Sequence, residues 1–168
     1  ESVAAQKRMM PETANWVENL LKETGFETRQ LEVAGAPNYV YGTIKGKSDF
    51  TLLLYNHYDV QPETPIELWE SSPFEVTEKD GKLVARGICD NKAELISRIC
   101  AIRAIQSAQG ELPINIKWII EGEAPMDVYG YRATRFGNYY SDHVYAAERT
   151  KESVKYYYRL RFPHDEHE

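Results

Sequence analysis

Residues 52–62 read LLLYNHYDVQP, an apolar run of strand-forming residues that ends at His57, with Asp59 two positions later. His57 is therefore expected where a buried strand opens into a loop, which is where open α/β sheets bind their ligands. A carboxylate two positions after a histidine can orient the imidazole. A surface-loop histidine beside an ordinary turn aspartate explains the same residues equally well. These residues alone leave both alternatives open.

The composition predicts a globular protein. With 168 residues, of which 42% are apolar and 12% aromatic, the chain is one domain or part of a larger one and can form a real core. The net charge of −6, without a basic stripe, predicts no nucleic-acid partner. No apolar run is long enough to cross a bilayer and no signal-peptide layout is found, so no membrane partner is expected. Cys89 and Cys100 lack CxxC spacing, which favours free thiols in the cytoplasm.

Apolar periodicity predicts alternating helices and strands. Helices are expected at 2–24, with a break near Pro11, and at 91–109. Strands are expected at 27–33, 38–44, 50–55, 74–77, 82–85, 114–120, 144–147 and 154–160. The run at 50–55 is continuous, which is typical of a central strand covered on both faces. The predicted fold is an α/β three-layer sandwich with a central, mostly parallel sheet covered by helices.

Three potential metal ligands each follow the end of a predicted strand: His57, Asp90 and Glu148. Imidazole and carboxylate groups that converge from separate strand ends can bind Zn²⁺. Two of these residues have simpler explanations. Asp90 directly precedes the long amphipathic helix and could be its N-cap residue. Glu148 stands beside Arg149 and could be an ordinary solvent-exposed charge.

Three ordered blocks resemble one family of zinc metallopeptidases. They are HYDVQP at 57–62, ELWESSPFEVTEKDGKLVARGICDNKAELISRI at 67–99 and LPINIKWIIEGE at 112–123. The family includes carnosinases, carboxypeptidase G, acetylornithine deacetylase and succinyl-diaminopimelate desuccinylase. The resemblance is nearly continuous over residues 1–123 and is strongest to the dipeptidase branch.

The resemblance assigns roles to individual residues. His57 matches a histidine ligand of the first metal, and Asp59 matches the catalytic-site aspartate that steadies its imidazole. Asp90 matches the carboxylate that bridges two metals, and in the family the peptide bond after it is typically cis. The segment SDHVYAAERTKESVKYYYRLR at 141–161 resembles a later strand–loop–strand, which makes Glu148 the acidic ligand that completes the first shell.

The chain also departs from the family pattern. Where relatives have a general-base glutamate and a glutamate that binds the second metal, this sequence has Ala124 and Pro125, and Glu123 is the nearest substitute. The resemblance does not extend to the family's lid domain or to its C-terminal portion, so both are expected to be absent. The resemblance therefore implies one zinc site, with Mn or Co as possible substitutes, and loss of the second site.

The resulting hypothesis is a partial zinc-peptidase catalytic domain at 1–162 followed by an acidic tail at 163–168. It implies a metal-dependent hydrolase of dipeptides or N-acyl amino acids, impaired in this chain, with a small peptide or N-acyl amino acid as substrate. The alternative is a non-catalytic fragment, or a degenerate relative, that keeps the fold and at most one metal. Apolar surface left uncovered by the missing portions would favour a homo-oligomer.

Overall fold

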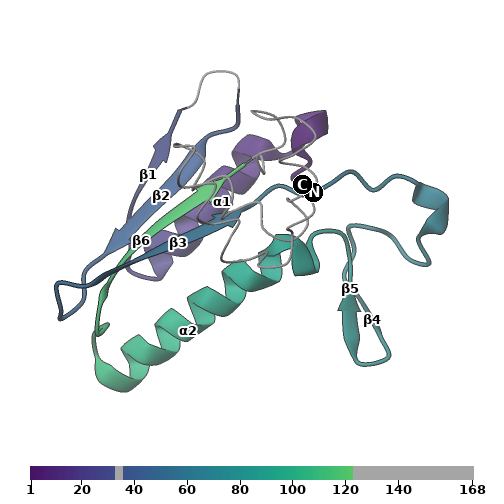
Figure 1. Ribbon diagram of the computed structural model, residues 1–168. Helices are drawn as coiled ribbons and strands as arrows, with labels where there is room; N and C mark the ends of the chain where they lie inside the picture. The colour runs from purple at the N-terminus through teal and green to yellow at the C-terminus, as the bar shows by residue number, and fades with distance from the viewer. Residues whose placement is uncertain (33–35, 123–168) are drawn as a thin grey trace, which may run out of the picture. The chain divides into compact units, whose positions relative to one another are not determined.

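The computed structural model describes residues 1–32 and 36–122, which lie in one compact unit that ends at Glu123. A sheet and two long helices form its body (Figure 1). The helices are α1 (Met10–Glu23) and α2 (Ala93–Gln109), and short helical turns are η1 (Ala4–Gln6), η2 (Ile66–Leu68) and η3 (Ile88–Lys92). The strands are β1 (Glu27–Leu31), β2 (Tyr39–Ile44), β3 (Thr51–His57), β4 (Thr77–Lys79), β5 (Lys82–Val84) and β6 (Asn115–Glu121). The strands predicted at 144–147 and 154–160 lie outside the described residues.

The main sheet has the strand order β1-β2-β6-β3. Strands β1 and β2 pair antiparallel, as do β2 and β6, and among the described strands only β3 and β6 pair parallel. The α/β class is confirmed, but the described sheet is mixed rather than mostly parallel. The reason lies in the connections: β1 and β2 are joined by a short loop, whereas β3 and β6 are joined by a long crossover that contains α2.

Both long helices cover the same face of this sheet. Leu21 of α1 lies against Gly42, and Arg98 of α2 donates to the side chain of Asn56 on β3. The two helices also meet, because Gln106 donates to the carbonyl of Thr24 at the end of α1. Their buried residues share one apolar core with β6, in which Trp118 is fully buried. The described residues therefore form two layers, and the predicted third layer is not found among them.

Strand β3 lies at one edge of the described sheet, and β2 and β6 are the two inner strands. Phe50 is 79% exposed and Leu53 is 62% exposed. The prediction of a central strand covered on both faces is therefore wrong for the described residues. A continuous apolar run is typical of a buried strand, but its neighbours decide whether the strand is covered.

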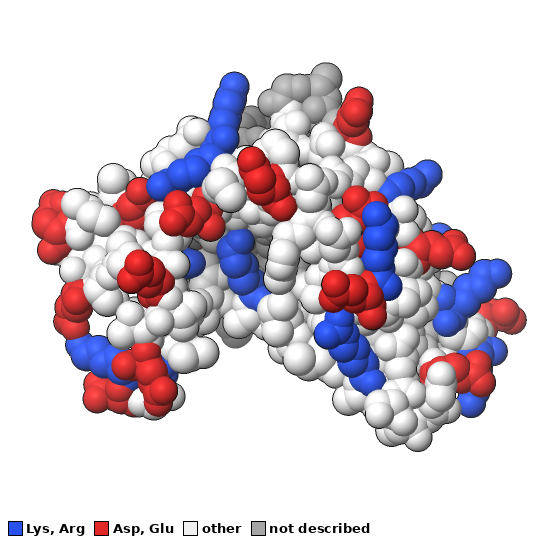
Figure 2. Space-filling model, turned by 180° about the vertical axis from the view of Figure 1, so that it is seen from behind, with Lys and Arg blue, Asp and Glu red and all other residues white. Residues whose placement is uncertain are grey.

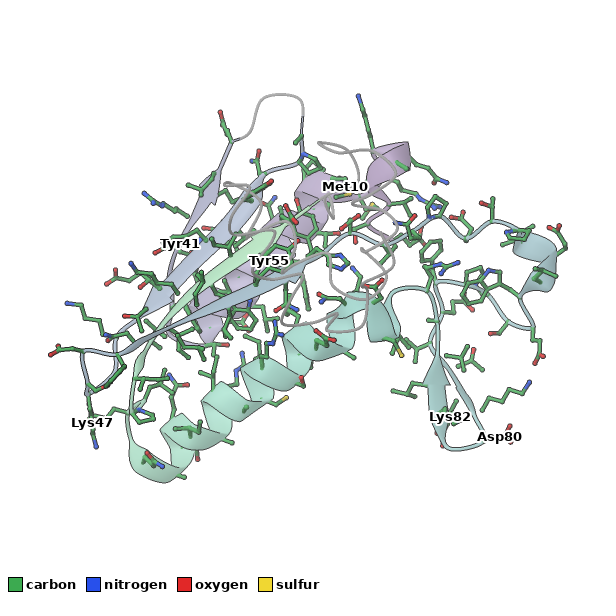
Figure 3. All side chains as sticks on the ribbon, viewed as in Figure 1. Met10, Tyr41, Lys47, Tyr55, Asp80 and Lys82 are labelled. Atoms are coloured by element: carbon green, nitrogen blue, oxygen red, sulfur yellow. The ribbon has the colours of Figure 1, made fainter. Side chains whose placement is uncertain are left out.

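The predicted hairpin around Asp80-Gly81 is confirmed as β4 and β5. Its first strand lies at Thr77–Lys79, however, and not at the predicted 74–77. Both turn residues have positive φ, 52° at Asp80 and 71° at Gly81, as a tight hairpin turn requires. Figure 3 shows Asp80 and Lys82 at the hairpin tip.

The surface charges are mixed in sign. In Figure 2, lysine and arginine side chains alternate with acidic ones over the face that is shown. Among the described residues, the helices are too short or too polar to span a membrane.

Candidate metal-binding site

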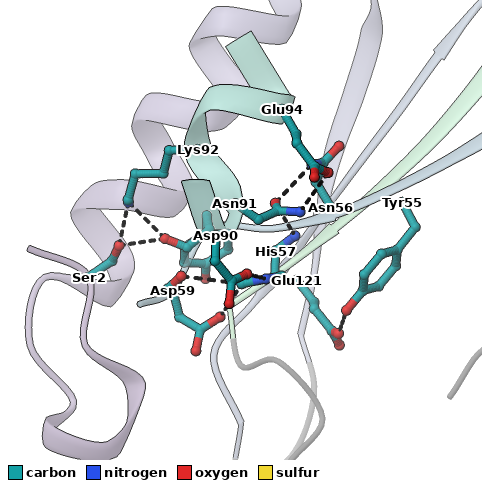
Figure 4. Close-up of polar contacts among 11 residues, drawn as sticks. Ser2, Tyr55, Asn56, His57, Asp59, Asp90, Asn91, Lys92, Glu94 and Glu121 are labelled. Carbon is teal, nitrogen blue, oxygen red and sulfur yellow. Dashed lines mark hydrogen bonds and ion pairs between the residues drawn. The ribbon is translucent and has the colours of Figure 1, made fainter. Parts of the chain in front are cut away.

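The imidazole of His57 lies between two carboxylates at the carboxyl end of β3 (Figure 4). Its Nδ1 is 3.0 Å from Asp59 Oδ1, and its Nε2 is 2.9 Å from Asp90 Oδ1. His57 and Asp59 are buried, whereas the Asp90 side chain is 64% exposed. The structure thus brings together three of the four residues that the sequence singled out, and one of the three is open to solvent.

The two carboxylates control the charge of the imidazole. Burial opposes a charged ring and lowers the pKa of His57, but the hydrogen bonds and charges of Asp59 and Asp90 outweigh it and raise the pKa from 6.5 to about 10. The hydrogen bond from His57 in turn lowers the pKa of Asp90. Without a metal, His57 is therefore a buried imidazolium at neutral pH. A divalent cation that takes its Nε2 as a ligand has to displace this proton.

Asp90 reaches His57 through a sharp change of chain direction after β5. Gly87 has a φ of 83°, and a Cβ at this position would lie 2.2 Å from Val60 Cγ1, so only glycine lets this loop pack on the loop after His57. The peptide bond between Asp90 and Asn91 is cis, as the resemblance implied. Asp90 and Asn91 also have non-helical backbone angles within η3. Asp90 is thus part of an irregular turn before α2 and not a simple N-cap.

A buried amide network that sequence reasoning missed lies directly behind this pair. Asn91 Oδ1 accepts a hydrogen bond from Asn56 Nδ2 at 2.8 Å and lies 3.3 Å from the backbone nitrogen of His57. Asn56 Oδ1 accepts hydrogen bonds from Trp118 Nε1 and from Arg98. The available signal was Asn56 itself, a polar residue at the end of an apolar strand.

A second support holds the backbone between His57 and Asp59. The Tyr58 carbonyl accepts hydrogen bonds from Ser2 Oγ at 2.5 Å and from Lys92 Nζ at 2.9 Å. Lys92 Nζ also donates to Ser2 Oγ at 2.7 Å. The N-terminal segment and the start of α2 therefore fix the loop that carries Asp59.

These residues fit part of a metal shell. Imidazole nitrogen and carboxylate oxygen are typical zinc ligands, and a buried carboxylate on the far ring nitrogen is the usual way to orient such an imidazole. A catalytic zinc site takes three protein ligands. Within residues 1–32 and 36–122, however, no three His, Cys, Asp or Glu side chains are gathered so that they could hold a metal ion. Glu148, Glu123, Ala124 and Pro125 lie outside the described residues.

Comparison with known proteins supports the zinc-peptidase resemblance. Residues 53–126 match the model of peptidase family M20/M25/M40. The chain is 44% identical over 72 residues to the human Beta-Ala-His dipeptidase, a match that covers 43% of this chain and 14% of that protein. It is 32% identical over 112 residues to a Cysteinylglycine-S-conjugate dipeptidase of Corynebacterium striatum, covering 66% of this chain and 24% of that protein.

Solved structures agree with this assignment. An M20 family metallo-carboxypeptidase, Sso-CP2 from Sulfolobus solfataricus, matches with a TM-score of 0.70 and 36% identity, over 74% of this chain and 28% of that chain. Human carnosine dipeptidase 1 matches with a TM-score of 0.67 and 26% identity, over 79% of this chain and 30% of that chain. The chain therefore contains part of a peptidase M20 catalytic domain. It spans less than a third of the length of these relatives.

A second family model covers the C-terminal part. Residues 121–168 match the FAD dependent oxidoreductase central domain. The peptidase match ends at 126, close to the end of the described compact unit at Glu123. Glu148 thus lies in the stretch that matches the second model, and its assignment as a metal ligand stays a prediction.

Proposed function

We propose that this chain is the first part of a metal-dependent hydrolase domain and binds one zinc ion through His57 and Asp90. The observation that supports the proposal best is the pair of contacts on the imidazole, with Asp59 on Nδ1 and Asp90 on Nε2. The dipeptidases among its relatives point to amide bonds of small peptides as the substrate class. The family resemblance adds N-acyl amino acids. The zinc-dependent activity, the substrate and the ligand set are all part of this proposal.

Each residue has one role in the proposed site. His57 Nε2 and an Asp90 oxygen bind the metal, and Asp59 holds the ring so that Nε2 points toward Asp90. Bound zinc supplies a polarised water and a Lewis acid for the amide carbonyl. We retain Glu148 as the proposed third ligand, and Mn²⁺ or Co²⁺ as substitutes for zinc.

The proposed activity is impaired in this chain. Ala124 and Pro125 stand where the resemblance places the general base and a ligand of the second metal. Loss of a general base typically lowers the rate by about 10²–10⁴-fold. The alternative is a non-catalytic protein that keeps the fold and at most one metal. The change of family model at 121–126 favours this alternative for the chain as it stands.

A hydrolysis assay separates the two. A dipeptide such as β-alanyl-histidine is incubated with the chain and Zn²⁺, Mn²⁺ or Co²⁺, beside His57→Ala, the double variant Ala124→Glu/Pro125→Glu and the control Asp80→Ala. An impaired enzyme shows slow turnover that requires His57 and rises in the double variant. Turnover at the buffer rate in all variants would leave the non-catalytic alternative.

Two further proposals concern the surroundings of the protein. The exposed apolar residues Phe50 and Leu53 at the edge of the sheet favour self-association, so we propose a homo-oligomer. Cys89 and Cys100 are free and exposed, which suits a reducing compartment, and we propose the cytoplasm.

A further inference from the structure

The side chains of Asn56 and Asn91 form a buried contact behind the candidate metal site. Asn56 is fully buried at the end of β3, and Asn91 is 4% exposed in η3, just before α2. Asn56 Nδ2 donates to Asn91 Oδ1 at 2.8 Å. This bond joins the residue before His57 to the residue after Asp90.

The orientation of both amides is fixed by their other partners. Asn56 Oδ1 accepts from Trp118 Nε1 at 3.0 Å and from Arg98, so its Nδ2 has to point toward Asn91. Asn91 Nδ2 donates to Glu94 Oε2 at 3.2 Å, which turns Asn91 Oδ1 back toward Asn56 and toward the His57 backbone N–H. Each amide thus has a donor and an acceptor in place, and neither can flip without losing hydrogen bonds.

We propose that Asn56 and Asn91 are positioning residues that set the distance between His57 and Asp90. Asn91 Oδ1 accepts hydrogen bonds both from Asn56 and from the backbone of His57, so one oxygen atom fixes the end of β3 against the turn that carries Asp90. A change of this contact moves one metal ligand relative to the other, although neither asparagine touches the metal. The inference rests on the proposed metal site and names the residues that preorganise it.

The sharpest variant is Asn56→Asp. It keeps oxygen acceptors for Arg98 and Trp118 but removes the N–H that Asn91 Oδ1 accepts. The Asn91 amide then turns its Nδ2 toward the new carboxylate, and the His57 N–H loses its acceptor. The second variant is Asn91→Leu. It has a similar side-chain volume but removes both the acceptor and the donor of the Asn91 amide. The control is Asn115→Leu, because Asn115 is a half-buried amide at the opposite end of β6, where its Oδ1 accepts from the Gly46 N–H.

Two measurements test the proposal on the full chain. The first is amide hydrogen exchange at His57 without metal, and the second is the affinity for Zn²⁺ by calorimetry. We expect exchange at least ten-fold faster and zinc affinity about ten- to a hundred-fold lower in Asn56→Asp, as is typical of residues that support metal ligands. Asn115→Leu should change the exchange rate at His57 and the zinc affinity by no more than two-fold. This should hold even if it lowers the unfolding midpoint as much as Asn56→Asp does.

Other outcomes are informative. Unchanged exchange at His57 in both Asn56→Asp and Asn91→Leu would overturn the proposal, as would zinc affinity equal to that of wild type in a folded variant. Zinc binding by wild type that survives His57→Ala would instead overturn the proposed metal site. In that case the exchange measurement alone decides whether the asparagine pair fixes His57. A variant that does not fold is replaced by the other of the two.

Discussion

The two ends of strand β3 differ in a way that residue type alone does not explain. The first half of the strand is largely apolar and exposed, with Leu52 44% and Leu53 62% exposed among the described residues. Its end is polar and buried, with Asn56 fully buried and His57 6% exposed. The polar end can be buried because its donors and acceptors are partnered by Asn91, Trp118, Arg98 and two carboxylates. Polar side chains are therefore buried where hydrogen-bond partners are available. The candidate metal site lies at the end of β3, where these partners meet.

The largest loss of stability is expected from Trp118→Ala. This substitution removes a side chain at the centre of the core and a hydrogen-bond donor to Asn56. Trp118 is fully buried, and its ring meets Phe26 edge-on with a centroid distance of 5.9 Å. Such truncations cost about 3–5 kcal/mol. Urea unfolding followed by circular dichroism should show this loss or an unfolded chain. A loss under about 1 kcal/mol would contradict the assignment of this residue to the core that supports the polar end of β3.

The buried imidazolium predicts a pH dependence of stability in the absence of metal. The pKa of His57 is raised in the folded state from 6.5 to about 10. The protonated imidazole therefore contributes fully to the free energy of unfolding below about pH 6.5, and this contribution is lost as the pH rises toward 10. The total is on the order of a few kcal/mol. Urea midpoints measured with a chelator at pH 6.5, 8 and 9.5 should fall in wild type and stay flatter in His57→Gln. Parallel curves for the two proteins would show that the two carboxylates do not hold the proton on His57.

Gly87→Ala tests the contact that brings Asp90 to the buried end of β3. The positive φ costs about 1–3 kcal/mol for a residue with a side chain, and the new Cβ also meets Val60. Gly81→Ala is the matched control, since Gly81 has a positive φ but no atom within 4 Å of an added Cβ. Thermal unfolding should rank Gly87→Ala as the more destabilised. Equal loss in both variants would mean that the approach to Val60 adds nothing beyond backbone strain.

The smallest effect is expected at the exposed end. At protein concentrations low enough to keep the chain monomeric, Leu53→Ala should change the unfolding free energy by less than about 0.5 kcal/mol. The same substitution at Leu95, which is 3% exposed on α2, should cost about 2–5 kcal/mol. A larger loss of stability in the monomer would contradict the exposure of Leu53, whereas a loss that appears only at higher protein concentration would support the proposed homo-oligomer.

Sequence patterns predicted the described elements well because local signals dominate there. The apolar stripe of α2 and the Asp80-Gly81 turn each specify one structure with little help from the rest of the chain. The sequence also singled out His57, Asp59 and Asp90, through their places at strand ends and through the family resemblance, and the structure brings these three side chains together. Their roles in a metal site stay a prediction. The predicted cover of β3 was wrong because a strand's exposure depends on distant chain segments. The Asn56–Asn91 contact was missed because asparagines far apart in sequence give no periodic signal.

The central claim is that His57 and Asp90 bind one metal ion together, and zinc titration of single variants tests it most directly. Wild type, His57→Ala, Asp90→Ala and the exposed-acid control Asp80→Ala are each titrated with Zn²⁺ at pH 7.5 by calorimetry. We expect sub-micromolar binding by wild type and by Asp80→Ala, and loss of that binding in both His57→Ala and Asp90→Ala. Zinc affinity that is the same in all four proteins would contradict the claim.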